Sequence, residues 1–169
     1  MKIGGKKFDI VARKEGEKIE GVTASATKIQ KNQSITTSNA EFYIESTSIA
    51  KIIKPPFPAS YYSYYEADDG KKYVEISFSY KNTSTSSVDA DSVISATLIY
   101  NAEYKYYGFT TIEENNRSDF TYTNITNVAA LETAYIHYLF EVPDEVASSN
   151  SSLEIVFTID GNTYNYKIR

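Results

Sequence analysis

Tyrosine is the residue type best placed to take part in binding. The 169-residue chain has 16 Tyr, no Trp and no Cys. Two clusters stand out, and their members are Tyr61, Tyr62, Tyr64 and Tyr65, then Tyr104, Tyr106 and Tyr107. Exposed Tyr rings suit stacking on sugars or anchoring a protein partner, and two clusters side by side would form a Tyr-lined patch. The alternative is that several of these rings fold back over the edge of the fold as a cover.

Acidic residues in loops raise the question of a Ca²⁺ site. They are Asp68, Asp69, Asp89 and Asp91. Ca²⁺ takes six to eight oxygen ligands, and the Asp89-Ala90-Asp91 run is only a fragment of a calcium-binding loop. We therefore interpret these carboxylates as solvated turn residues and predict no metal and no cofactor.

His137 is the only histidine. One His without any Cys argues against a Zn site, and a Ser–His–acid triad would have to use this residue. The alternating pattern around it places His137 on the outward face in the middle of a predicted strand. We predict a surface or edge-strand histidine without a catalytic role.

Paired carboxylates are the remaining candidate for catalysis. Glu113-Glu114 and the Glu66/Asp68 pair are candidates for the two acids of a glycosidase, which need to face each other across a cleft about 5–9.5 Å apart. Nothing in their spacing supports that arrangement. We predict a protein that is not an enzyme.

The element that organises the chain is a strand over residues 73–81. Val74, Ile76, Phe78 and Tyr80 alternate with polar residues, which is the period of a strand with one buried and one solvated face. Residues 73, 75, 77, 79 and 81 are expected on the solvated face. Turn-type residues bound the run on both sides.

Further strands follow with turns every 8–12 residues. We expect them at 93–100, 104–111, 133–142, 153–159 and 164–168, with a tight hairpin turn at Asp160-Gly161-Asn162. Residues 34–53 are also expected to be β structure, and residues 120–125 to begin a short strand or an irregular crossing. The long connection over 54–70 is of the kind that is often functional or mobile. Seven or eight short strands predict an all-β, immunoglobulin-like sandwich of two antiparallel sheets with Greek-key connections.

Composition narrows the classes of function. The net charge of −5 argues against nucleic-acid binding, and no apolar run is long enough to span a membrane. We expect residues 32–169 to form the sandwich and residues 1–31 to be an N-terminal arm or additional strands. The first residues lack the apolar stretch of a signal peptide, so the protein is cytoplasmic unless an export signal precedes the given sequence.

Two segments carry a resemblance to a known family. Residues 70–84 (GKKYVEISFSYKNTS) and residues 131–144, ending in FEVPD, resemble strands of immunoglobulin-like domains in bacterial, mostly Gram-positive, lipoproteins and surface proteins. The Pro-Gly of the second motif is missing here. The fold of that family is similar to that of secreted mycobacterial immunoprotective antigens, and the resemblance extends over about residues 34–169.

The resemblance implies an exported module at the cell envelope, lipid-anchored in its precursor, and brings no catalytic residues. We expect an interaction or structural role with a protein or glycan partner. The alternative is a carbohydrate-binding module that uses the Tyr clusters.

Overall fold

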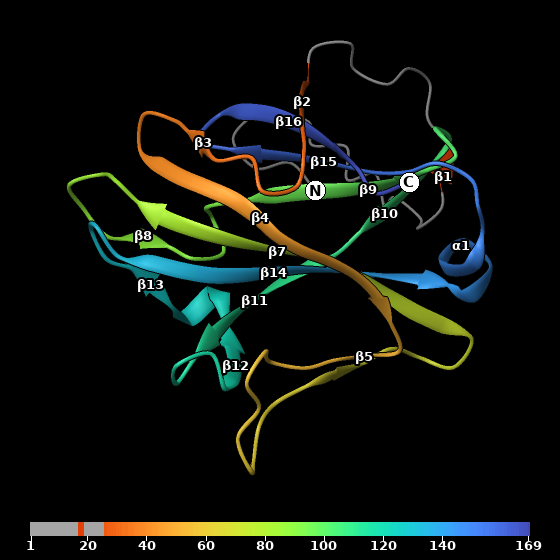
Figure 1. The fold of residues 1–169 in the computed structure, drawn as a ribbon, viewed down its shortest axis with the longest axis horizontal. Coiled ribbons are helices and arrows are strands. Elements are labelled where there is room, and N and C mark those ends of the chain that lie inside the picture. Colours follow the sequence, from red (N-terminus) through yellow and green to blue (C-terminus); the bar gives the residue numbers. More distant parts are fainter. Residues whose placement is uncertain (1–16, 19–25) are drawn as a thin grey trace, which may run out of the picture.

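Two six-stranded sheets face each other and enclose the core (Figure 1). The computed structural model describes residues 17–18 and 26–169. In spatial order, the first sheet is β1 (Glu17–Lys18), β10 (Tyr104–Tyr107), β9 (Ser95–Tyr100), β15 (Leu153–Ile159), β16 (Asn162–Lys167) and β2 (Thr27–Ile29). The second sheet is β12 (Asp119–Tyr122), β11 (Phe109–Glu114), β14 (Thr133–Pro143), β7 (Lys71–Asn82), β4 (Ala40–Ala50) and β3 (Ile35–Thr36).

Short elements complete the fold. One two-stranded ribbon pairs β8 (Val88–Asp89) with β13 (Asn127–Val128), and another pairs β5 (Ile52–Ile53) with β6 (Tyr65–Glu66). The helical elements are the 3₁₀ turn η1 (Thr123–Ile125) and α1 (Asp144–Ser148). Along the described ranges, neither element approaches the length that a membrane-crossing helix needs.

The chain crosses between the sheets several times. It passes from β7 to β9 and β10 in the first sheet, to β11 and β14 in the second, and back to β15 and β16. The orders β4-β7-β14-β11 and β16-β15-β9 match the A-B-E-D and G-F-C sheets of an immunoglobulin-like sandwich. The predicted all-β sandwich of two antiparallel sheets with Greek-key connections is confirmed.

The predicted boundary at residue 31 stays a prediction. Strands β1 and β2 fall within residues 1–31 and pair with β10 and β16. The rest of that stretch, residues 1–16 and 19–25, lies outside the described residues.

The central strand lies where the sequence places it. Strand β7 pairs with β14 along its length and with β4 on its other side. Its core face meets a cluster of aromatic rings between the sheets: Phe157 lies 6.0 Å from Phe42, 5.2 Å from Phe78 and 5.6 Å from Tyr164, measured between ring centroids. Edge-to-face and offset ring packing of this kind adds to the hydrophobic effect of burying the rings.

The prediction that one face of β7 is solvated is wrong for the first half of the strand. Tyr73, Glu75 and Ser77 are buried, as is Leu139 opposite them. A second, smaller hydrophobic cluster covers this face, in which Tyr73 and Leu139 contact Phe120 of β12 and residues of the β5–β6 region. Alternation shows which residues share a face, but it does not show whether another layer covers that face.

The predicted strand over 104–111 is divided between the two sheets. Strand β10 pairs with β9 in the first sheet, and after Gly108 the chain continues as β11 beside β14 in the second. A Cβ atom on Gly108 would lie 2.1 Å from the carbonyl oxygen of Leu139. This close approach of two backbones requires glycine at the crossing.

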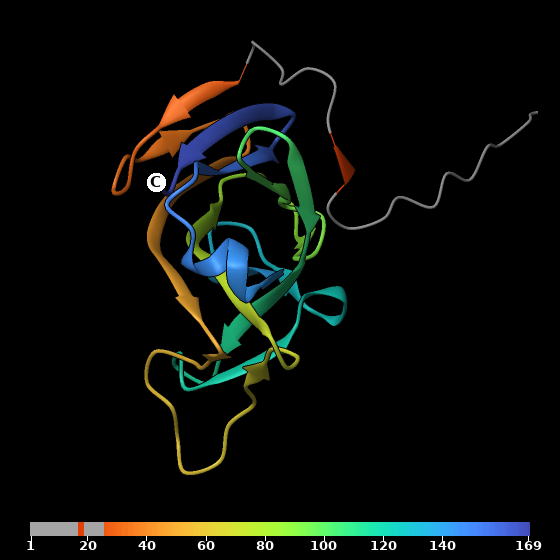
Figure 2. The same ribbon diagram turned by 90° about the vertical axis from the view of Figure 1, so that its right-hand side faces the viewer.

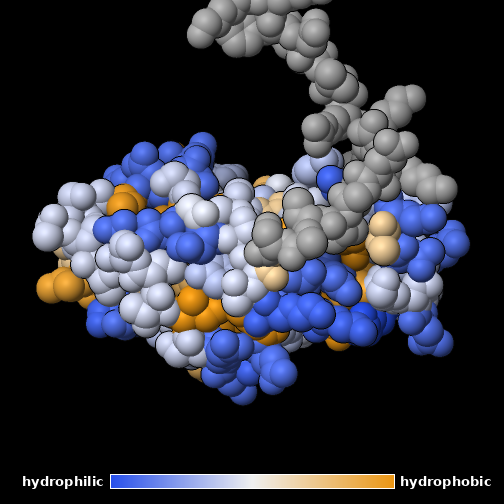
Figure 3. All heavy atoms as spheres, turned by 90° about the horizontal axis from the view of Figure 1, so that it is seen from above, coloured by the Kyte–Doolittle hydropathy of each residue, from blue (hydrophilic) through white to orange (hydrophobic). Residues whose placement is uncertain are grey.

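The outer surface of the first sheet is largely polar. Seen from the side of β2, β15 and β16 (Figure 3), hydrophilic side chains cover most of the coloured surface, and apolar ones form narrow strips between them. The most exposed aromatic side chains described below lie in the second sheet or on segments that pack beside it.

A candidate binding loop and its buried charged support

Residues 54–64, here called the aromatic loop, connect β5 to β6. Figures 1 and 2 both show this connection projecting beyond the two sheets at the lower end of the molecule. Phe57 is 65%, Tyr61 93% and Tyr64 54% exposed. Exposed aromatic rings gathered on one segment offer an apolar surface to a partner, and aromatic side chains are among those that dominate binding energy at protein interfaces.

The aromatic loop is tied to the hairpin of β11 and β12. The amides of Phe57 and Ala59 donate to the carbonyls of Arg117 and Ser118 at 3.2 and 3.3 Å. The amide of Ser63 donates to Oδ1 of Asp119 at 2.7 Å. This bond comes first among those that hold the pKa of Asp119 below its ordinary value. A loop fixed before binding loses less conformational freedom when a partner arrives.

Some members of the first Tyr cluster are exposed to solvent, and others pack against the fold. Tyr61 and Tyr64 are exposed, and Tyr62 is half-buried with its ring 6.3 Å from that of Tyr64. Tyr65 instead packs with its ring 5.1 Å from that of Phe109, and its hydroxyl donates to Thr111 Oγ1 at 3.1 Å. The cluster is therefore partly exposed and partly packed against the fold, and a binding role for its exposed members stays a prediction.

The second Tyr cluster lies elsewhere. Tyr104, Tyr106 and Tyr107 form most of β10 in the first sheet, away from the aromatic loop in both ribbon views (Figures 1 and 2). Tyr106 is buried in the main core, whereas Tyr104 and Tyr107 are partly exposed. The two clusters do not form one patch.

Arg117 links the aromatic loop to the interior. Asn115, Asn116 and Arg117 all have positive φ, from 52 to 66°, so this turn is left-handed. Asn adopts this conformation more readily than most residues, but Arg does so at a cost. The turn brings the Arg117 guanidinium back over the sheet, 3.8 Å from the ring centroid of Tyr135 and 5.9 Å from that of Phe57.

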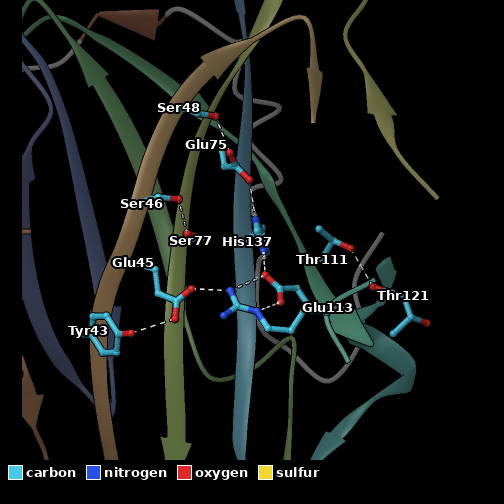
Figure 4. Close-up of polar contacts among 11 residues, drawn as sticks. Tyr43, Glu45, Ser46, Ser48, Glu75, Ser77, Thr111, Glu113, Thr121 and His137 are labelled. Atoms are coloured by element: carbon cyan, nitrogen blue, oxygen red, sulfur yellow. Dashed lines mark hydrogen bonds and ion pairs between the residues drawn. The ribbon is translucent and has the colours of Figure 1, made fainter. Parts of the chain in front are cut away.

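Under this turn lies a network of alternating charges. Arg117 binds the carboxylate of Glu113 through two nitrogens and donates to Glu45 Oε2 at 2.6 Å. His137 Nε2 lies 2.7 Å from Glu113 Oε1, and its Nδ1 lies 2.6 Å from Glu75 Oε1. Figure 4 shows these side chains reaching across neighbouring strands of the second sheet.

The network joins four strands, β4, β7, β11 and β14, and the turn between β11 and β12 that carries Arg117. Glu45 sits at a bulge in β4, between Ile44 and Ser46, where the pairing with β7 shifts. The bulge lets both Glu45 and Ser46 reach the outer face, where Ser46 Oγ lies 2.7 Å from Ser77 Oγ. Beyond it, the Ser48 hydroxyl donates to Glu75 at 2.5 Å.

The geometry fixes the charge on His137. Both ring nitrogens face carboxylate oxygens, which accept hydrogen bonds only, so both nitrogens must carry protons. Burial alone would lower the pKa of His137, but the hydrogen bonds to Glu113 and Glu75 outweigh it and raise the pKa above its ordinary value. Burial likewise works to raise the pKa of Glu113, and the bonds from His137 and Arg117 reverse this and lower it.

The predicted surface position of His137 is wrong. The residue is 4% exposed, and the ring of Phe120 packs edge-on against it with centroids 5.0 Å apart. The histidine is on the predicted face, but β12 covers that face. Two features of the sequence point to the network: Glu113 and Arg117 are four residues apart, and Glu75 shares the expected outer face of the two central strands with His137.

The other acidic candidates divide between the surface, where Asp68, Asp69 and Asp91 lie, and the interior, where Glu113 lies. Asp68 and Asp69 sit in the turn before β7, where they form ion pairs with Lys71 and Lys51. Asp91 is exposed, and Glu113 is committed to the buried network rather than to a cleft. Within residues 17–18 and 26–169, no three His, Asp or Glu side chains are arranged to hold a metal ion.

Comparisons with known proteins support the fold. The chain is similar to an uncharacterized β-sandwich protein from Clostridium difficile 630, with a TM-score of 0.80 and 28% identity over 89% of this chain and 99% of that one. A conserved hypothetical protein from Bacillus anthracis matches at a TM-score of 0.55 and 11% identity over 82% of this chain and 93% of that one. No family model and no curated protein matches. The β-sandwich is therefore shown, and the relation to bacterial lipoproteins stays a prediction.

Proposed function

We propose that this protein is a non-enzymatic interaction module that engages a protein partner through the aromatic loop. The observation that carries the proposal is a projecting loop whose exposed rings, Phe57, Tyr61 and Tyr64, are presented by a backbone anchored at three points. Exposed aromatic anchors on a preorganised segment are typical of the residues that dominate binding energy.

The geometry of the rings favours a protein partner over a sugar at this loop. A sugar platform needs exposed rings that lie roughly in one plane. The exposed ring of Tyr64 is inclined by 61° to that of its half-buried neighbour Tyr62, so these two rings do not lie in one plane. Such rings suit separate pockets on a partner better than one flat pyranose face.

The test compares capture by the original chain and by a loop variant. The triple substitution Phe57→Ser, Tyr61→Ser and Tyr64→Ser removes the exposed rings, and we expect it to change the free energy of unfolding by no more than about 0.5 kcal/mol. The immobilised original chain should retain a partner from an envelope extract that the triple variant does not. The matched control is Ile125→Ser with Leu131→Ser, which removes two equally exposed apolar side chains outside the loop. Equal retention by all three proteins would contradict the proposal.

The cellular setting is a separate part of the proposal. The resemblance of residues 70–84 to strands of exported immunoglobulin-like domains supports a place at the bacterial envelope, with a lipid anchor on the precursor. Fractionation of the source cells with an antibody against this chain should recover it with membrane or cell wall. Recovery in the cytoplasm would overturn this part and leave the role of the loop open to the capture experiment.

A further inference from the structure

A pocket opens where the chain crosses from the first sheet to the second. It has a volume of about 360 Å³, and its aromatic lining consists of Phe109, Tyr122 and Tyr138. Asp91 and Asn124 also line it, and Gly108 lies at its base, at the crossing between β10 and β11. The volume is at the lower end of the range for small-molecule sites, about 300–1,000 Å³, and so suits a small ligand or one unit of a larger one.

Two of the aromatic rings that line this pocket, Phe109 and Tyr122, remain exposed to solvent. The ring of Phe109 packs against those of Tyr65 and Tyr73, with centroids 5.1 and 6.1 Å away, yet 41% of the residue is exposed. Tyr122, the last residue of β12, is 66% exposed. The pocket therefore has one ring fixed by its neighbours and one that stands open to solvent.

The polar groups at the rim are available. Among the described residues, the side chains of Asp91 and Asn124 and the hydroxyl of Tyr122 have no hydrogen-bond partner, whereas the hydroxyls of Thr110 and Thr123 bond to each other at 2.8 Å. A carboxylate offers acceptors, and a carboxamide offers both donors and an acceptor. Together they match neighbouring hydroxyl groups on one ligand.

The charge of the lining selects among ligands. Of the described residues that line the pocket, none is Lys or Arg, and Asp91 gives it a negative charge. An anionic ligand would meet repulsion there without a compensating cation. A neutral polyhydroxylated ring satisfies both features, because its C–H face packs on aromatic rings and its hydroxyls bond to the rim.

We propose that this pocket binds one unit of a neutral saccharide. The site is separate from the aromatic loop and uses none of the Tyr residues that the sequence singled out. It goes beyond the proposed function by giving the same module a second ligand of a different class.

The experiment follows backbone amide signals by NMR while neutral oligosaccharides are added. The probes are cellotetraose, maltotetraose, chitotetraose and mannotetraose, and tetragalacturonate and tetramethylammonium serve as anionic and cationic comparisons. We expect at least one neutral probe to shift the amides of residues 108–110 and 122–124. We also expect Tyr122→Ala to weaken its binding about tenfold.

The matched variants test the rim. Asn124→Ala and Asp91→Asn should each weaken the neutral probe several-fold, whereas Asn127→Ala, an exposed Asn three residues further on that does not line the pocket, should leave its affinity unchanged. No shift with any neutral probe overturns the proposal, and so do shifts at the pocket with only the anionic or the cationic comparison. Because the pocket variants leave the aromatic loop intact, loss of sugar binding with retained protein capture, or the reverse, separates this proposal from the previous one.

Discussion

His137 holds the central positive charge of the buried network, and its protonation is linked to folding. Burial disfavours the charged ring, but the hydrogen bonds to Glu113 and Glu75 raise its pKa in the folded protein above the ordinary value of about 6.5. A raised pKa means that the folded state binds the proton more tightly than the unfolded chain does. The stabilisation is therefore complete below about pH 6.5 and is lost as the pH rises through the folded-state pKa.

The resulting prediction concerns the ring proton and the pH dependence of stability. As the chain has one histidine, its ring signal in a proton NMR titration is unambiguous, and we expect a pKa above about 6.5. In denaturant unfolding between pH 6 and 9, the original protein should lose stability with rising pH. The variant His137→Gln, which does not titrate, should start lower and lack this slope. A ring pKa below the ordinary value would show that the histidine is neutral and that the charge assignment is wrong.

At the scale of elements, the crossing from β10 to β11 depends on the absence of one side chain. The Cβ of an alanine at position 108 would collide with backbone of Leu139 and lie 2.9 Å from Phe140 Cδ1. Backbone atoms of a central strand cannot move aside without breaking the pairing of β14 with its neighbours. The same crossing forms the base of the pocket.

We expect Gly108→Ala to destabilise the fold by about 3 kcal/mol or more, at the upper end of the cost of overpacking. Gly161→Ala is the matched control, because its Cβ would meet nothing within 4 Å and only its φ of 74° is unfavourable. That control should cost about 1–2 kcal/mol. Chemical denaturation measures both, and equal losses would show that the tight contact at residue 108 relaxes at little cost.

At the scale of the whole molecule, the sequence predicts where strands form better than it predicts which segments pack over each face of the sheets. The alternation in residues 73–81 and 133–142 predicts two strands of one sandwich, and they pair directly as β7 and β14. The Asp160-Gly161 turn also forms as predicted, with positive φ at both residues. These features depend on the alternation of neighbouring residues and on the residue types in the turn, and both can be read from the sequence.

The buried network could not be predicted in the same way. Glu75 and His137 occupy the face that alternation marks as polar, and they are buried because β12 and the β5–β6 region fold over that face. Where these short segments pack depends on tertiary contacts between residues far apart in the sequence, such as Tyr73 and Phe120. The exposure of Tyr61 and the partial burial of Tyr65 have the same origin, since the two rings differ only in what lies beside them.

The parallel pairing of β2 with β16 determines how the molecule responds to force. Thr27, Lys28 and Ile29 lie beside Tyr164, Asn165 and Tyr166 and run in the same direction. Tension between handles at residues 26 and 169 therefore slides these strands along each other and loads their hydrogen bonds together. Handles at residues 152 and 169, which flank the antiparallel β15–β16 hairpin at one end, would instead open bonds one after another. In single-molecule pulling, we expect the first geometry to need the larger force, because several hydrogen bonds must break at once.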